Sequence, residues 1–248
     1  MMTAEPMPPV RTTHVWHTPA GPWCYDQWGR HGRPVVLIPP VLFDRTMWWP
    51  AAADLRPHAT VLAVDLPGHG QSAPRERYDP DDLVDDLACL IHSLDLRQAP
   101  VVVGHGSSAS LANLFAARYA THAVVTVDAA EPTPGDIATG PRDVRSYLSG
   151  LHLDALPPRY HDLVTPRQDP GLLAAYAGCM VPELPVTPAG PAGRPARLAV
   201  HSRPPCWVRP LGTASVAAPW RHEIYEVDGR FAHLTDITRF VHDIRTLL

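Results

Sequence analysis

Short apolar runs rich in β-branched residues recur along this chain, and stretches with helical periodicity separate them. The runs show no alternation of polar and apolar residues, so we expect both faces of each to be buried. Strands of this kind, joined through helices, are typical of a parallel sheet covered on both sides, and right-handed crossovers then give a doubly wound α/β domain. The predicted strands are residues 35–38, 60–65, 101–104, 124–128, 197–201 and 223–227.

Three helices are predicted from apolar residues that repeat on one face. Residues 80–94 carry leucines and one isoleucine on a single stripe, with Asp79 as the expected N-cap. Residues 107–119 follow the third predicted strand directly, and residues 233–248 end the chain with a further apolar stripe. The order of elements therefore favours a single α/β domain.

One long segment interrupts the alternation. Residues 131–195 contain 12 prolines and no convincing strand, although helices are possible at 144–151 and 171–180. We expect this segment to be a cap or lid inserted over the carboxyl ends of the strands, where ligands bind in open α/β folds. The core would then comprise residues 1–130 and 196–248. The alternative is a Pro-rich loop without regular structure.

Composition excludes several classes of protein. A formal net charge of −4 and the scattered basic residues give no nucleic-acid or membrane-binding patch. No apolar stretch approaches the roughly 18 residues that span a bilayer, so we expect a cytoplasmic protein. The four cysteines lie far apart and form no zinc-binding pattern, so no metal and no cofactor is expected. All 21 basic residues are Arg, and there are 30 prolines, a composition typical of a GC-rich, actinobacterial genome.

Two motifs carry a resemblance to a known family. Residues 64–72 read VDLPGHGQS, and residues 101–108 read VVVGHGSS before a helix. Both resemble the strand-and-turn signatures of α/β-hydrolases, and their order and spacing match that family from about residue 20 to the end. The resemblance implies the α/β-hydrolase fold, with the insertion at residues 131–195 as its cap.

The positions that carry catalysis in that family hold other residues here. Residues 104–108 overlay the G-x-S-x-G elbow with Gly106 at the nucleophile, where no acyl-enzyme can form. Pro39 and Pro40 replace the usual His-Gly of the oxyanion loop, and proline has no N–H to donate. Pro205 falls at the acid and Arg230 at the catalytic histidine. The resemblance thus implies a member without the Ser-His-acid triad.

A pocket is still expected beneath the cap, mostly apolar with a few polar groups. Its polar members have plain alternatives: His105 and His233 as packed histidines, Ser107 as a helix-capping residue, and Arg230 as a solvated rim residue. Asp128 ends a strand at the same edge and is a candidate to orient His105 or Arg230. The predicted lining is Val41, Leu42, Trp48, Trp49, His105, Gly106, Ser107, Arg230 and His233.

Three functions remain open. The chain resembles the atypical α/β-hydrolase of bottromycin biosynthesis, a peptide epimerase, and this implies a cofactor-independent isomerase whose substrate, a modified macrocyclic peptide, carries its own proton through an Asp β-carboxylate. A second hypothesis is a retired hydrolase that binds or sequesters a small molecule. A third is a hydrolase in which Ser107 and His233 form a displaced catalytic pair. The sequence leaves the oligomeric state open.

Overall fold

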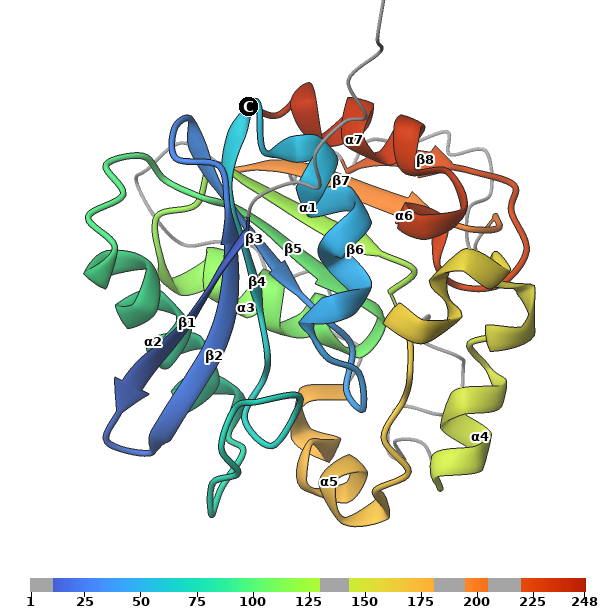
Figure 1. The fold of residues 1–248 in the computed structure, drawn as a ribbon, viewed down its shortest axis with the longest axis horizontal. Coiled ribbons are helices and arrows are strands. Elements are labelled where there is room, and N and C mark those ends of the chain that lie inside the picture. Colours follow the sequence, from blue (N-terminus) through green and yellow to red (C-terminus); the bar gives the residue numbers. More distant parts are fainter. Residues whose placement is uncertain (1–10, 130–142, 181–194, 205–219) are drawn as a thin grey trace, which may run out of the picture.

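The structure is a computed structural model and describes residues 11–129, 143–180, 195–204 and 220–248. Its centre is one eight-stranded sheet with the order β1-β2-β4-β3-β5-β6-β7-β8 (Figure 1). From β4 to β8 all neighbours are parallel, whereas β2 runs antiparallel to both of its neighbours. The strands are β1 (Arg11–Thr18), β2 (Gly21–Trp28), β3 (Arg33–Ile38), β4 (Ala59–Val64), β5 (Val101–His105), β6 (Ala123–Val127), β7 (Ala196–His201) and β8 (Arg221–Ile224).

Helices cover both faces of the sheet. On one side lie α1 (Trp49–Leu55), α6 (Ala232–Thr235) and α7 (Ile237–Arg245), and on the other lie α2 (Pro80–Ser93) and α3 (Ala109–Arg118) (Figure 1). The doubly wound α/β arrangement predicted from the sequence is confirmed. The Asp79 side chain accepts the N–H of Asp81 as the N-cap of α2, also as predicted. No helix in these ranges is long and apolar enough to cross a membrane.

The N-terminal hairpin was not predicted. Residues 11–28 look polar in sequence, yet they form β1 and β2 at the edge of the sheet. Asp26 is fully buried there, and it accepts hydrogen bonds from Thr13 and from the Trp49 indole while pairing with Arg45 at 3.0 Å. A buried carboxylate interrupts the apolar pattern by which a buried strand is predicted. Asp26 can be buried because its hydrogen bonds and ion pair compensate the cost, and these partners cannot be read from the sequence.

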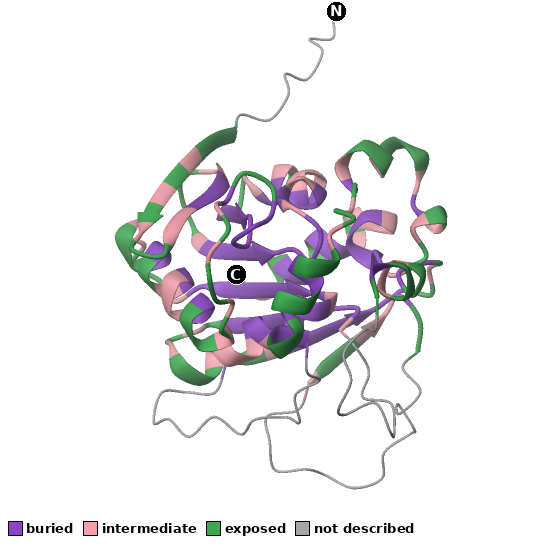
Figure 2. Cartoon of the chain, turned by 90° about the horizontal axis from the view of Figure 1, so that it is seen from below, coloured by how far each residue is buried: buried purple, intermediate pink, exposed green. Residues whose placement is uncertain are grey.

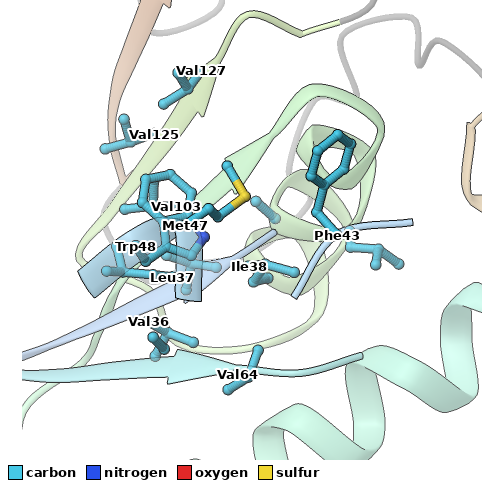
Figure 3. Close-up of a cluster of buried hydrophobic side chains, with 14 of the residues drawn as sticks. Val36, Leu37, Ile38, Phe43, Met47, Trp48, Val64, Val103, Val125 and Val127 are labelled. Carbon is cyan, nitrogen blue, oxygen red and sulfur yellow. The ribbon is translucent and has the colours of Figure 1, made fainter. Parts of the chain in front are cut away.

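The core fills the space between the sheet and its helices. The central strands are buried, and exposure is concentrated on β1 and on the outer sides of the helices (Figure 2). Trp48 and Met47, from the 3-10 turn η1 (Arg45–Trp48), lie among the side chains of β3, β5 and β6 (Figure 3). This packing places the turns at the ends of β3 and β5 on a rigid base.

The turn after β4 is closed by a dense hydrogen-bond network. The Asp65 carboxylate accepts the N–H groups of Arg45 and Gln71 and pairs with the Arg45 guanidinium. His69 accepts the Leu42 N–H at 2.8 Å through Nε2, so its Nδ1 carries the proton and donates to Pro67 O at 3.1 Å. Burial raises the pKa of Asp65 to about 6 and lowers that of His69 to about 4.

Part of the predicted cap lies within the described ranges, at residues 143–180. It contains α4 (Val144–Ser149) and α5 (Pro170–Ala175), with the 3-10 turns η3 (Leu153–Ala155), η4 (Pro158–Leu163) and η5 (Ala177–Met180) between and after them. The Arg167 N–H donates to Leu42 O, and the Tyr176 hydroxyl donates to Pro67 O. These bonds hold the segment against the loops that follow β3 and β4.

Candidate ligand-binding site

The turn between β5 and α3 has the conformation of a nucleophile elbow, but a glycine stands at its apex. β5 ends at His105, and the 3-10 turn η2 (Gly106–Ser108) leads into α3. Gly106 has φ +54, the left-handed region that a non-glycine residue enters only at a cost. A Cβ built on Gly106 would meet only Pro40 Cβ, at 3.4 Å, so the apex has room for a side chain that the sequence does not supply.

Ser107 follows the apex, and its hydroxyl has two partners. The Val41 N–H donates to Ser107 Oγ at 2.9 Å, and the Tyr147 hydroxyl lies 3.1 Å from the same oxygen. Tyr147 comes from α4, so this contact joins the core to the 143–180 segment. Burial raises the pKa of Tyr147 to about 12, so both hydroxyls are neutral at physiological pH.

The loop after β3 keeps a main-chain donor, and this corrects the expectation that Pro39 and Pro40 remove it. In elbow sites the second oxyanion donor is an N–H from this loop, and the first is the N–H of the residue after the apex. Val41 supplies the loop N–H, which Ser107 Oγ occupies. The sequence did not indicate this donor, because Pro39 and Pro40 have no N–H and a main-chain N–H at Val41 has no residue signature.

His105 is the last residue of β5 and directly precedes the apex. It is fully buried, and its Nε2 bonds to Arg230 O at 2.7 Å, so Nε2 carries the proton and Nδ1 is an acceptor. Among the described residues Nδ1 has no hydrogen-bond partner. Burial lowers the pKa of His105, although the Asp128 carboxylate opposes this. The imidazole is therefore neutral and serves to anchor the Arg230 main chain.

His233 does not pair with Ser107, so the displaced catalytic pair does not form. Both ring nitrogens of His233 are buried and without a hydrogen-bond partner within the described part of the chain. Its ring packs 4.3 Å from Trp48 and 5.1 Å from His105, between centroids. Burial holds the pKa of His233 well below its ordinary value. An imidazole in this state is not positioned to take a proton from Ser107.

Asp128 stabilises the neighbouring loops and does not orient His105 or Arg230 through a hydrogen bond. It follows β6 with φ +45, and its carboxylate accepts the N–H and the hydroxyl of Ser202 at 2.6 and 2.7 Å. It also accepts the N–H of Ala232 at 3.3 Å, at the beginning of α6. A single carboxylate thus joins the ends of β6 and β7 to the start of α6.

The remaining predicted site residues fall in different places. Leu42 is fully buried, and its main chain bonds to His69 and Arg167. Trp49 does not join the group, because its indole donates to Asp26 and its ring lies 3.5 Å beneath the Arg11 guanidinium. The Arg230 side chain is half-buried and makes no ion pair with a described residue. Pro205 lies outside the described residues.

The family model of the α/β-hydrolases matches residues 31–241. The chain belongs to the α/β-hydrolase family. The match spans the elbow, the Asp65 turn and the described cap segment, so it covers every residue of the candidate site. The structural neighbours have the same fold.

Two solved structures illustrate how closely the family fold is kept. An AqdC variant in complex with its substrate, solved to explain recognition and ring cleavage of the Pseudomonas quinolone signal, is 17% identical with a TM-score of 0.75, over 96% of this chain and 98% of that one. The enol-lactonase from Burkholderia xenovorans LB400 is 18% identical with a TM-score of 0.69, over 94% and 99%. At these identities the likeness shows the fold alone.

A curated relative matches part of the chain. The dihydrolipoyllysine-residue acetyltransferase component of an acetoin cleaving system from Pseudomonas putida is 28% identical over 153 residues. These residues are 60% of this chain, which spans only 39% of that protein. The match therefore adds no activity to the family assignment.

Proposed function

We propose that this chain is a non-hydrolytic member of the α/β-hydrolase family that lacks the catalytic triad. The observation that carries the proposal is Gly106, which takes the backbone conformation of a nucleophile without a nucleophilic atom. In the sequence match to the family, Arg230 falls at the position of the base and Pro205 at that of the acid. Loss of one triad member already lowers the rate by several orders of magnitude, and here all three positions are changed.

The ligand in this proposal is a small organic molecule or macrocyclic peptide bound between the core and the 143–180 segment. The neutral hydroxyls of Ser107 and Tyr147 meet at that boundary and suit a carbonyl or carboxylate oxygen. Arg230, at the rim and without an ion pair among described residues, is the expected partner of a ligand carboxylate.

The reaction that we propose is epimerisation of a modified peptide at an Asp α-carbon, as in the atypical α/β-hydrolase of bottromycin biosynthesis. Neither His105 nor His233 is placed to act as a base, and in this proposal the substrate supplies the proton acceptor. The substrate's β-carboxylate takes the α-proton, and the electron pair delocalises into an adjacent electron-withdrawing heterocycle. The β-carboxyl group exchanges its proton with solvent and then returns a proton to the opposite face of the α-carbon. The protein contributes dehydration and orientation.

A second candidate is a protein that sequesters its ligand without turning it over. The Ser107 and Tyr147 hydroxyls bond to each other, Ser107 also accepts the Val41 N–H, and no described group within hydrogen-bond reach of them is a base. Such an arrangement can hold an oxygen atom without reacting with it. Ligand-dependent stabilisation without turnover would favour this candidate over the isomerase.

The decisive experiment is incubation in deuterated water with a macrocyclic peptide that carries Asp beside a heterocycle. We expect one deuterium at that α-carbon, an otherwise unchanged mass, and a slower exchange with Arg230→Gln. Arg203→Gln, which changes an exposed arginine after β7, is the matched control and should exchange at the wild-type rate. Tight binding without exchange would select the sequestering role. Cleavage of a p-nitrophenyl ester that Ser107→Ala abolishes would overturn the whole proposal.

A further inference from the structure

Four buried polar atoms that have no hydrogen-bond partner in the described part of the chain lie close together behind the elbow. They are Nδ1 of His105, both ring nitrogens of His233, and Nε1 of Trp48. The three side chains are fully buried and their rings are neighbours, with centroid distances of 4.3 Å for Trp48–His233, 5.1 Å for His105–His233 and 6.2 Å for Trp48–His105. Buried polar atoms are nearly always hydrogen-bonded in native proteins, so a cluster of four requires a partner.

The hydrogen-bonding capacity of this cluster is balanced. The Trp48 indole is a donor only. His105 gives its proton to Arg230 O, so its Nδ1 is an acceptor. A neutral His233 carries one N–H and one bare nitrogen, which adds one donor and one acceptor. The cluster therefore presents two donors and two acceptors.

We propose that His105, His233 and Trp48 form an internal binding site for a water molecule. Water donates two hydrogen bonds and accepts two, which is the complement of what these side chains present. The fully buried rings exclude a larger ligand, and the aromatic rings of Phe231 and Phe240 complete the enclosure. Buried waters typically make about three hydrogen bonds to otherwise unsatisfied groups, as this site permits.

A second unpartnered indole gives a useful contrast. Trp23 is also buried, and its Nε1 has no partner among the described residues. Its neighbour is the Arg75 guanidinium, 5.8 Å from the ring centroid, whose unpartnered Nε is another donor. A water molecule between these two donors would find no acceptor for its own hydrogens. Trp23 therefore serves as a control for the loss of an indole N–H.

The water would position the elbow. His105 immediately precedes Gly106, and its other nitrogen holds the Arg230 main chain. Water on Nδ1 would fit the tautomer that the bond to Arg230 O selects, would fix the angle of the ring, and so would link α6 to the end of β5. This role is independent of any ligand bound beneath the cap.

The test is a crystal structure at about 1.2 Å resolution or better, together with NMR of the indole N–H groups. We expect an isolated density peak about 3 Å from at least three of the four atoms, and a magnetisation transfer from water to the Trp48 indole proton. Trp48→Phe should weaken or remove the peak, and Trp23→Phe should leave it in place. Absence of the peak in the wild type, or a direct His105–His233 hydrogen bond in its place, would overturn the proposal.

A variant that does not fold leaves this test intact. The density and the NMR transfer are read in the wild type, and His233→Phe provides a second route to the loss of the peak. The expected result there is one fewer long-lived internal water. Retention of the same water in both Trp48→Phe and His233→Phe would show that other groups hold it.

Discussion

Two strand-to-helix turns lie one strand apart at the carboxyl edge of the sheet, after β4 and after β5. In the Asp65 turn, both carboxylate oxygens of Asp65 and both nitrogens of His69 have partners. At the elbow, His105 and His233 keep three nitrogens without a partner among described residues. The glycines differ in the same way: a Cβ on Gly70 would overlap the Asp65 carboxylate, whereas one on Gly106 meets only Pro40.

This difference shows which constraints the chain has kept. In the Asp65 turn, the side chains of Asp65 and His69 have hydrogen-bond partners at every polar atom. Replacing either residue alone would therefore leave buried polar groups without a partner. The elbow keeps its backbone shape, since Gly104 would clash with Ser108 O if it gained a Cβ, yet its apex tolerates a different residue.

The largest expected effect is on the Asp65 turn, where the buried polar side chains have their hydrogen-bond partners. Asp65→Ala leaves the buried Arg45 guanidinium with one carboxylate fewer, and removal of one partner of a buried pair typically costs about 3–5 kcal/mol. We expect a loss of that size in the free energy of unfolding, measured by urea denaturation. Asp82→Ala on the exposed side of α2 is the control and should change it by less than about 0.5 kcal/mol. An equally small loss for Asp65→Ala would contradict the comparison.

Alanine substitutions at Gly70 and Gly106 compare the two turns by the same measurement, the free energy of unfolding. Gly70→Ala introduces both a left-handed alanine and an overlap with Asp65, so we expect a loss of about 2–4 kcal/mol. Gly106→Ala has the same backbone cost without the overlap, and a loss of about 1–2 kcal/mol is expected. Chemical denaturation of both variants checks the order. Equal losses would mean that the two turns are constrained alike.

The pH dependence of stability tests the buried imidazoles. Burial lowers the pKa values of His69, His105 and His233, so below about pH 6.5 the unfolded chain binds protons that the folded chain does not. Their contribution to stability is therefore lost as the pH falls. Asp65, with its pKa raised to about 6, acts in the opposite direction, because the folded state then takes up the proton first.

We expect a net loss of stability between pH 7 and pH 5, because these three histidines, together with the less buried His122 and His222, whose pKa burial also lowers, oppose one aspartate. His233→Phe should reduce the slope by up to about 1.4 kcal/mol per pH unit, measured as denaturation free energy across the series. His92→Gln, an exposed residue on α2, is the matched control. An unchanged slope in His233→Phe would show that His233 is not held neutral in the folded state.

The smallest effect concerns the contact between the elbow and α4. Tyr147→Phe removes the hydroxyl that meets Ser107 Oγ, and one neutral hydrogen bond is worth about 0.5–1.5 kcal/mol. Thermal unfolding should show a loss in that range. Tyr160→Phe, in the same segment but without a hydroxyl bond to a described residue, should be neutral. An unchanged stability in Tyr147→Phe would show that this hydrogen bond does not stabilise the fold.

Sequence patterns predicted the parallel half of the sheet closely, because fully buried strands display their burial as apolar runs. They missed β1 and β2, where Asp26 is buried with partners from elsewhere in the chain. The last strand was placed at residues 223–227 and lies at Arg221–Ile224, since its half-exposed residues give a weak pattern.

The site was predicted in part for related reasons. The elbow and the conformation required at Gly106 follow from local sequence. The Val41 N–H and the Tyr147 hydroxyl do not, because a main-chain donor has no residue signature and Tyr147 is 40 positions away from Ser107. Trp49 was misplaced because successive residues at a helix start point about 100° apart, so Trp48 enters the core and Trp49 reaches Asp26.

The hydrogen bond from the Val41 N–H to Ser107 Oγ has a consequence for selectivity. Any incoming molecule that uses this donor competes with an acceptor tethered to the same chain, whose effective concentration is high at all times. A neutral ester carbonyl gains little by such an exchange, whereas an ionised oxygen forms a hydrogen bond roughly twice as strong. The Ser107 hydroxyl thus favours ligands with an ionised oxygen over ligands with a neutral carbonyl at this N–H.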